Sequence, residues 1–192
     1  NASAGATDAV RRKRERKNID EIHRKHIEKA MSFLPRPAKT LFDMGCGAGT
    51  TLIEARKLGM QAEGNEINKA SVDLLISEGF KAYHGFTQEL DLPKSAYDIV
   101  INFDYLEHSY TPLEDLKTCH GMLAPGGVLY LKTLYLGCPA HQEKGINWQL
   151  FGPGHFHFFT PPVLTRLIEE AGFKVLDVKT GQLIFVAAQK AA

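Results

Sequence analysis

The feature that most constrains this fold is a glycine-rich turn between an expected strand and an expected helix. A short apolar stretch at residues 40–43 ends in Asp43, and the turn Met44-Gly45-Cys46-Gly47-Ala48-Gly49 leads into an apolar-periodic run at residues 50–58. Glycine reaches backbone angles that other residues avoid, and it lets a ligand lie directly against the main chain. At the carboxyl end of a parallel strand, such a turn is typical of a nucleotide or cofactor site.

The chain beyond the turn fits one α/β domain built on a doubly wound sheet. Short apolar strands alternate with helical periods, which predicts a parallel sheet covered by helices on both faces. We expect strands at residues 40–43, 61–66, 81–84, 97–103, 128–133, 174–179 and 183–189, and helices at residues 50–58, 68–78, 112–122 and 163–171. Residues 134–160 show no clean period and are rich in Gly, Pro, His and aromatic residues. This predicts a functional lid inserted after the fifth strand.

A further helix is expected before the domain, over residues 7–34, because Pro35 and Pro37 end the helical pattern. Its first part is strongly basic, with the run Arg11-Arg12-Lys13-Arg14-Glu15-Arg16-Lys17. Such a run fits either a solvated helix start or a helix that meets a phosphate-rich partner. We therefore divide the chain into an N-terminal tail and helix at residues 1–38 and one domain at residues 39–192.

Composition narrows the classes of partner and the compartment. Lys and Arg total 23 against 22 Asp and Glu, so the net charge of +1 gives no global attraction to nucleic acid or to a membrane surface. The three cysteines, Cys46, Cys119 and Cys138, form no CxxC pair, which argues against a disulfide framework and a structural zinc site. No apolar run approaches the ~18 residues of a membrane span, and no signal peptide opens the chain. We expect a cytoplasmic protein without a membrane span, and its oligomeric state stays open.

The turn fits a sulfonium cofactor better than a dinucleotide. A dinucleotide fingerprint has the form G-x-G-x-x-G, whereas the third glycine here, Gly49, comes one position early. Asp43 would repel a pyrophosphate and attract a cationic ligand. Glu66 ends the second strand, where an acid can accept two hydrogen bonds from a ribose diol. These features indicate a ligand with a ribose, a positive charge and no phosphate, and S-adenosylmethionine is such a ligand.

Several motifs occur in a fixed order along the chain. They are Leu41-Phe42-Asp43-Met44-Gly45-Cys46-Gly47-Ala48-Gly49, Gly64-Asn65-Glu66, Tyr97-Asp98-Ile99-Val100, Leu106-Glu107-His108 and Leu123-Ala124-Pro125-Gly126-Gly127. Together they resemble the class I S-adenosylmethionine-dependent methyltransferases, in particular the methyltransferase-23 and ubiquinone-biosynthesis O-methyltransferase group. The resemblance extends from about Lys39 to Ala188 and implies a Rossmann-like sheet of seven strands with the last strand antiparallel.

The resemblance also implies a set of cofactor-binding residues at the carboxyl ends of the strands. These are Asp43, Gly45, Cys46, Gly47, Glu66, Ile67, Phe86, Asn102 and Phe103. Asp43 would hold the ammonium group of S-adenosylmethionine, Glu66 would bind the ribose hydroxyls, and Ile67 would flank the adenine. Cys46 belongs to the turn and is not expected to be a nucleophile, because methyl transfer needs none.

The acceptor site is expected just beyond the fourth strand and at the end of the lid. Asp104, Glu107 and His108 lie at i, i+3 and i+4, so a helical turn would place them on one face. With the later His155, this group resembles one that holds a divalent cation such as magnesium, which would lower the pKa of an acceptor hydroxyl. The alternative is that His108 or His155, beside Glu107, assists deprotonation directly. His157 is a further base candidate.

The expected function is methyl transfer from S-adenosylmethionine to a small-molecule acceptor, with a hydroxyl as the expected target. Aromatic side chains of the lid either wall an aromatic or apolar acceptor or pack the lid on the sheet; they are Trp148, Phe151, Phe156, Phe158 and Phe159. Two alternatives stay open. One is methylation of RNA ends or another macromolecule through the basic helix, and the other is a catalytically inactive cofactor-binding module.

Overall fold

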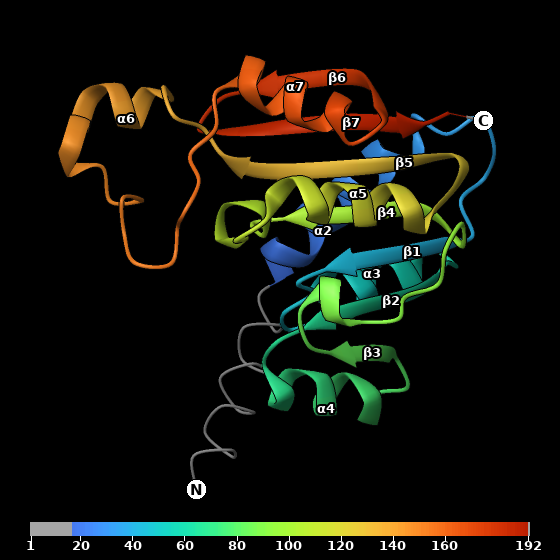
Figure 1. The fold of residues 1–192 in the computed structure, drawn as a ribbon. Coiled ribbons are helices and arrows are strands. Elements are labelled where there is room, and N and C mark those ends of the chain that lie inside the picture. The colour runs from blue at the N-terminus through green and yellow to red at the C-terminus, as the bar shows by residue number, and fades with distance from the viewer. Residues whose placement is uncertain (1–16, 192) are drawn as a thin grey trace, which may run out of the picture.

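A computed structural model describes residues 17–191, and its centre is a mixed sheet of seven strands (Figure 1). The strands are β1 (Thr40–Met44), β2 (Gln61–Glu66), β3 (Lys81–His84), β4 (Tyr97–Phe103), β5 (Leu123–Leu134), β6 (Phe173–Thr180) and β7 (Leu183–Lys190). Their spatial order is β3-β2-β1-β4-β5-β7-β6. The first five strands pair in parallel, and β7 runs antiparallel to both β5 and β6. The predicted doubly wound α/β fold with an antiparallel last strand is therefore confirmed.

Helices cover both faces of this sheet because successive strand side chains point to opposite faces. On one face, α2 (Lys17–Met31), α3 (Thr50–Lys57) and α4 (Lys69–Ser77) enclose a core that includes Leu41, Ile99 and Ile101. On the other face, α5 (Pro112–Met122) and α7 (Pro161–Glu170) enclose a core that includes Phe42 and Val100. Neighbouring residues of β1 and β4 thus serve different cores, as a buried parallel strand requires.

The strand order reverses between β1 and β4, which pair directly with each other at the middle of the sheet. The connections that follow these two strands leave the carboxyl edge in opposite directions. In open α/β sheets, ligands bind in the crevice at this point. The glycine turn after β1 and the short 3₁₀ helix η2 (Leu106–His108) after β4 both lie there.

The sequence Leu123-Ala124-Pro125-Gly126-Gly127 lies between the helix expected at residues 112–122 and the strand expected at residues 128–133. The structure includes it in β5, with Leu123 paired to Tyr97 and then a register shift before Val128 pairs with Ile99. Gly126 has φ +73°, a left-handed angle that favours glycine. This segment is therefore an irregularity at the start of a longer strand. Extra residues of this kind bend a strand without ending its pairing.

The expected lid is partly helical. It contains α6 (Pro139–Lys144) and the 3₁₀ helix η3 (Gly145–Asn147), and α6 stands beyond the carboxyl end of β5 in Figure 1. Trp148 and Cys138 are buried against Leu134 at the end of β5, which anchors this part of the lid. The bridge between Tyr135 and Phe159 closes its base.

The expected N-terminal helix is present in its described part as α2, which ends at Met31. The basic run of residues 11–16 lies outside the described residues. Within residues 17–191, no helix combines the length and the apolarity that crossing a membrane requires.

Candidate active site

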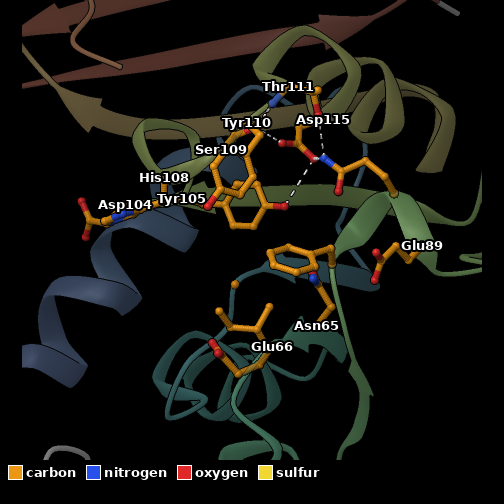
Figure 2. A pocket seen from close by; sticks show the side chains of 14 residues that line it. Asn65, Glu66, Glu89, Asp104, Tyr105, His108, Ser109, Tyr110, Thr111 and Asp115 are labelled. Carbon is orange, nitrogen blue, oxygen red and sulfur yellow. Dashed lines mark hydrogen bonds between the residues drawn. The ribbon is translucent and has the colours of Figure 1, made fainter. Parts of the chain in front are cut away.

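A cavity of about 520 Å³ opens at the carboxyl edge of the sheet, where the strand order reverses. Its walls come from the glycine turn, from the end of β2, from the 3₁₀ helix η1 (Thr87–Glu89) with the residue before it, and from the segment after β4. Figure 2 shows Asn65 and Glu66 on one side of the cavity and Tyr105, Ser109 and Asp115 on the other, with Asp104 and His108 at one end. The site therefore joins segments that are far apart in the sequence.

The glycine turn forms one wall of this cavity through its backbone. Gly45, Gly47 and Gly49 have φ angles of +67°, +52° and +76°, which L side chains rarely adopt. A Cβ at Gly45 would also lie 2.8 Å from Cδ2 of Tyr105, and a Cβ at Gly49 would lie 2.2 Å from Cδ2 of Leu75. The first clash concerns the cavity wall and the second concerns helix packing, so these two glycines are required for different reasons.

Glu66 is held in place at the edge of the cavity by backbone donors. One carboxylate oxygen accepts a hydrogen bond from the amide of Gly47 at 2.9 Å, and the other accepts one from the amide of Asn68 at 2.8 Å. A carboxylate has about four lone-pair sites, so each oxygen keeps capacity for a further donor such as a ribose hydroxyl. Ile67 and Phe86, which are 58% and 46% exposed, add apolar surface to the same cavity.

Asp43 lies beneath the turn and is almost fully buried. Burial raises its pKa to about 7, and a hydrogen bond from the Thr51 hydroxyl acts against this rise. Thr51 is in turn 2.9 Å from Nδ1 of His23 on α2. Burial, followed by the charge of Lys132, lowers the pKa of His23 to about 4, so this imidazole is neutral near neutral pH. A short polar chain thus connects α2 to the acid below the turn.

The structure brings four of the nine expected cofactor residues to the wall of the cavity. These are Gly45, Glu66, Ile67 and Phe86. Cys46 is buried, and burial raises the pKa of its thiol, which disfavours the nucleophilic thiolate. Asn102 is fully buried, and its amide nitrogen is 3.7 Å from the sulfur of Met44. Phe103 packs edge-on against the rings of His26 and Tyr130.

The expectation that Asp104, Glu107 and His108 share one helical face is wrong. Asp104 precedes the 3₁₀ helix and has φ +51°, and its exposed carboxylate pairs with the Lys132 ammonium at 2.6 Å. Glu107 is 1% exposed, and its carboxylate accepts a hydrogen bond from the Thr133 hydroxyl at 2.8 Å. Burial raises the pKa of Glu107. The left-handed backbone at Asp104 sends the two carboxylates in different directions.

The geometry also does not support the expected divalent-cation site at Asp104, Glu107, His108 and His155. Throughout residues 17–191, no three or more His, Cys, Asp or Glu side chains are grouped in a way that could hold a metal ion. Two of the four expected ligands are carboxylates already committed to Lys132 and Thr133. Of the four expected ligands, only the two histidines therefore lie together.

His108 and His155 come together although they lie on different segments. Their ring centroids are 4.7 Å apart. Nδ1 of His108 lies 2.6 Å from the carbonyl oxygen of Gly154, and Nδ1 of His155 lies 2.8 Å from that of Leu150. Because a carbonyl oxygen only accepts, each Nδ1 must carry its proton. In the neutral ring, Nε2 is then the free acceptor.

The segment after the lid helix is fastened to the turn after β4. The amides of Phe156 and His157 both donate to the carbonyl oxygen of Glu107, at 2.8 and 3.2 Å. The Phe156 ring stacks on Tyr110 with centroids 4.8 Å apart, and both rings are at least half exposed. His157 instead stacks on Phe159, with centroids 5.9 Å apart. This separates His157 from the histidine pair.

The aromatic residues of the lid divide between packing and exposure. Trp148 and Phe159 are buried, at 4% and 5% exposed, and Phe151 and Phe158 pack against each other and against Trp148. Phe156 is 50% exposed and pairs with Tyr110, which lines the cavity. Packing of the lid therefore accounts for most of this group, and Phe156 is the member placed beside the site.

Sequence reasoning missed the polar side chains that line the cavity opposite Glu66. They are Tyr105, Ser109 and Asp115, with Gln88 beside them. One signal was available for Asp115. It shares a helical face with the core residues Cys119 and Met122, at i+4 and i+7, and an acid on the buried face of an expected helix indicates a polar site.

Comparison with known proteins first defines the fold. The structure resembles a methyltransferase from Burkholderia thailandensis, 1,6-didemethyltoxoflavin-N1-methyltransferase, solved with 1,6-didemethyltoxoflavin and S-adenosylhomocysteine bound (TM-score 0.71, 17% identity, 100% of this chain and 88% of that chain). It also resembles the complex of the Haloferax volcanii Trm112 methyltransferase activator with a putative methyltransferase (TM-score 0.75, 15% identity, 99% of this chain and 97% of that chain). These likenesses establish a methyltransferase-type Rossmann fold.

The sequence comparison then gives the family. A family model described as a methyltransferase domain matches residues 10–178, so the chain belongs to the methyltransferase-domain family. A ubiquinone biosynthesis O-methyltransferase from Dinoroseobacter shibae is 28% identical over 160 residues, which cover 76% of this chain and 64% of that enzyme. This chain thus spans less than two thirds of that relative. The predicted membership of the class I S-adenosylmethionine-dependent methyltransferases is confirmed.

Proposed function

We propose that this chain transfers a methyl group from S-adenosylmethionine to a hydroxyl of a small, planar acceptor. The observation that carries the proposal is the histidine pair, His108 and His155, with both Nδ1 protons donated to backbone carbonyls. His108 lines the same cavity as Glu66. One cavity can therefore hold the methyl donor beside Glu66 and the acceptor beside the proposed base, His108.

The residues of the cavity fit S-adenosylmethionine. Gly45 brings its backbone and the Tyr105 ring packed on it to the cavity wall, and Glu66 keeps lone pairs for a diol beside the apolar Ile67 and Phe86. Asp43 is a buried carboxyl whose raised pKa leaves it half neutral near pH 7. A cation above it would favour its ionised form. When bound, S-adenosylmethionine supplies an electrophilic methyl group on a sulfonium sulfur.

His108 is the proposed base. Nε2 of His108 would take the proton of the acceptor hydroxyl as that oxygen is methylated. Its Nδ1–H bond to the Gly154 carbonyl fixes the ring orientation and tautomer. His155 packs against this ring and restricts its rotation. Methyl transfer is a single displacement, so alignment supplies most of the remaining rate.

The proposed acceptor is planar because of Tyr110 and Phe156. These stacked rings lie beside His108 and stay at least half exposed, which is unusual for two large aromatic side chains in contact. An aromatic ring carrying a hydroxyl can stack in offset fashion on either of them. The name of the Dinoroseobacter relative, an O-methyltransferase, supports the same kind of acceptor atom.

The proposal is tested by measuring S-adenosylhomocysteine release with matched acceptors. A catechol, an aniline of similar size, an aliphatic alcohol and a short RNA with a free 3′ end form a suitable set. We expect the highest turnover with the catechol and loss of that turnover in a His108→Asn variant. Turnover with only the amine or only the RNA would contradict the proposal.

A further inference from the structure

A chain of hydrogen bonds crosses the cavity floor and connects four elements. The amide nitrogen of Asn65 in β2 lies 3.0 Å from Oγ1 of Thr87 in η1. Thr87 Oγ1 lies 3.0 Å from the hydroxyl of Tyr105, which in turn lies 3.3 Å from Oδ1 of Asp115 in α5. Asn65, Thr87 and Asp115 are each no more than 1% exposed. The hydrogen-bonded network is therefore buried inside the protein and is not a surface contact.

The network has a defined direction. The Asn65 amide nitrogen donates, both to Thr87 and to the carbonyl oxygen of Gly85. At the other end, Asp115 accepts from Tyr105, so the Thr87 hydroxyl accepts from Asn65 and donates to Tyr105. Each hydroxyl then has one assigned role, and cooperative chains of this kind hold side chains in one orientation.

Asp115 is the point at which several donors of the cavity wall converge. Besides Tyr105, the Ser109 hydroxyl and the Gln88 side-chain amide donate to its carboxylate. All three donors line the cavity, and Figure 2 labels Tyr105 and Ser109 among them. Replacing this carboxylate would release three cavity-lining side chains together.

Tyr105 faces the glycine turn at close range. Its Cδ2 atom lies 2.8 Å from the position that a Gly45 Cβ would take, which is closer than a Cβ tolerates. The Tyr105 ring therefore packs directly against Gly45, and the ring and the turn form one continuous wall of the cavity. A ligand lying along the turn must contact this ring.

We infer that Tyr105 is a cofactor-binding residue and that Asp115 is a positioning residue that acts through Tyr105, Gln88 and Ser109. The inference rests on the proposed use of S-adenosylmethionine. The network fixes the wall against which the cofactor lies, so its loss weakens cofactor binding. It does not include His108, so the rate at saturating cofactor is retained.

The test compares Asp115→Asn and Tyr105→Phe with the control Glu114→Gln. Glu114 neighbours Asp115 on α5 but is exposed and pairs only with Lys117 among the ion pairs of residues 17–191. The measurements are the Kd for S-adenosylhomocysteine by calorimetry, and KM for S-adenosylmethionine and kcat by steady-state kinetics. We expect both network variants to raise Kd and KM about tenfold, with kcat within about twofold, because each loses a buried hydrogen bond to a charged group. The control should match the wild type.

The inference is overturned if both network variants bind S-adenosylhomocysteine as the wild type does, or if kcat falls while KM stays constant. If Asp115→Asn does not fold, Tyr105→Phe decides alone, because it keeps the ring and removes one oxygen. Failure of the wild type to bind S-adenosylhomocysteine would instead contradict the proposed function. The two failures are therefore distinguishable.

Discussion

The imidazole rings of His108 and His155 lie 4.7 Å apart, and each is oriented by a hydrogen bond to a main-chain carbonyl. One ring belongs to the 3₁₀ helix after β4 and the other to the end of the lid. His108 is the member of the pair that lines the cavity.

Replacing His108 should mainly slow the chemical step. We expect His108→Asn to lower kcat about 100-fold or more, since a positioned base contributes at least this much, and to leave KM for S-adenosylmethionine unchanged. His157→Asn is the matched control, because His157 stacks on Phe159 and points elsewhere. Equal losses in both variants would contradict the assignment.

Chelation should leave activity intact. The carboxylates of Asp104 and Glu107 are committed to Lys132 and Thr133, so they do not converge with the histidines. We expect turnover after EDTA treatment and dialysis to stay within about twofold of the untreated rate, since the proposed base needs no ion. Loss of activity that added magnesium restores would show that the acceptor is activated by a metal.

Cofactor affinity should depend on pH through Asp43. Burial raises its pKa to about 7, and the cationic cofactor favours the ionised form. The affinity for S-adenosylmethionine should therefore rise about tenfold between pH 6 and pH 8. The folding stability of the free protein depends on pH in the opposite direction. The stability that the raised pKa of Asp43 contributes is present below about pH 4 and is lost as the pH rises through about 7.

Asp43→Asn provides the check on this pH dependence. The amide cannot ionise, so the variant should bind S-adenosylmethionine weakly at all pH values and without the step near pH 7. Calorimetric titration at several pH values measures both properties. A step that persists in Asp43→Asn would assign the titration to another group.

Comparing two glycines separates the effect of a side chain at the cavity wall from the effect of backbone strain. Gly45 and Gly79 have similar φ angles, +67° and +74°, but a Cβ meets Tyr105 at Gly45 and nothing within 4 Å at Gly79. Both alanine variants should lose about 1 kcal/mol of stability from the left-handed backbone. Gly45→Ala should in addition weaken binding of S-adenosylhomocysteine at least tenfold, because its Cβ displaces the Tyr105 ring. Equal binding by both variants would contradict this role of Gly45.

The fold was largely predictable from local patterns. The bounds of β2, β3, β4 and α5 agree with the expected ranges, because residues such as Gly59, Gly79, Gly85 and Pro112 mark several of their ends. The start of β5 was not predictable, because Pro125 and Gly126 normally end a strand. Here pairing of Leu123 with Tyr97 extends β5 beyond the irregularity.

The parts of the site that lie directly at the ends of strands were predictable from the sequence. The parts that form where distant segments of the chain meet were not. Gly45 directly follows β1 and Glu66 ends β2, so the strand order fixes their positions, and both line the cavity. The divergence of Asp104 from Glu107 depends on one left-handed residue, which sequence spacing does not reveal. The meeting of His108 with His155 depends on the hydrogen bonds of residues 156 and 157 to Glu107. Asp115 was predictable as a site residue, because it is a charged residue on the buried face of an expected helix.

The most direct test of the account is calorimetric titration of S-adenosylhomocysteine into the wild type and a Glu66→Ala variant. Glu66 is the residue whose oxygens are held beside the cavity with capacity for a diol. We predict binding with one site per chain, and a Kd at least about tenfold higher in Glu66→Ala, because two charge-assisted hydrogen bonds are lost. Absence of binding by the wild type, or tight binding of NAD in its place, would contradict the account.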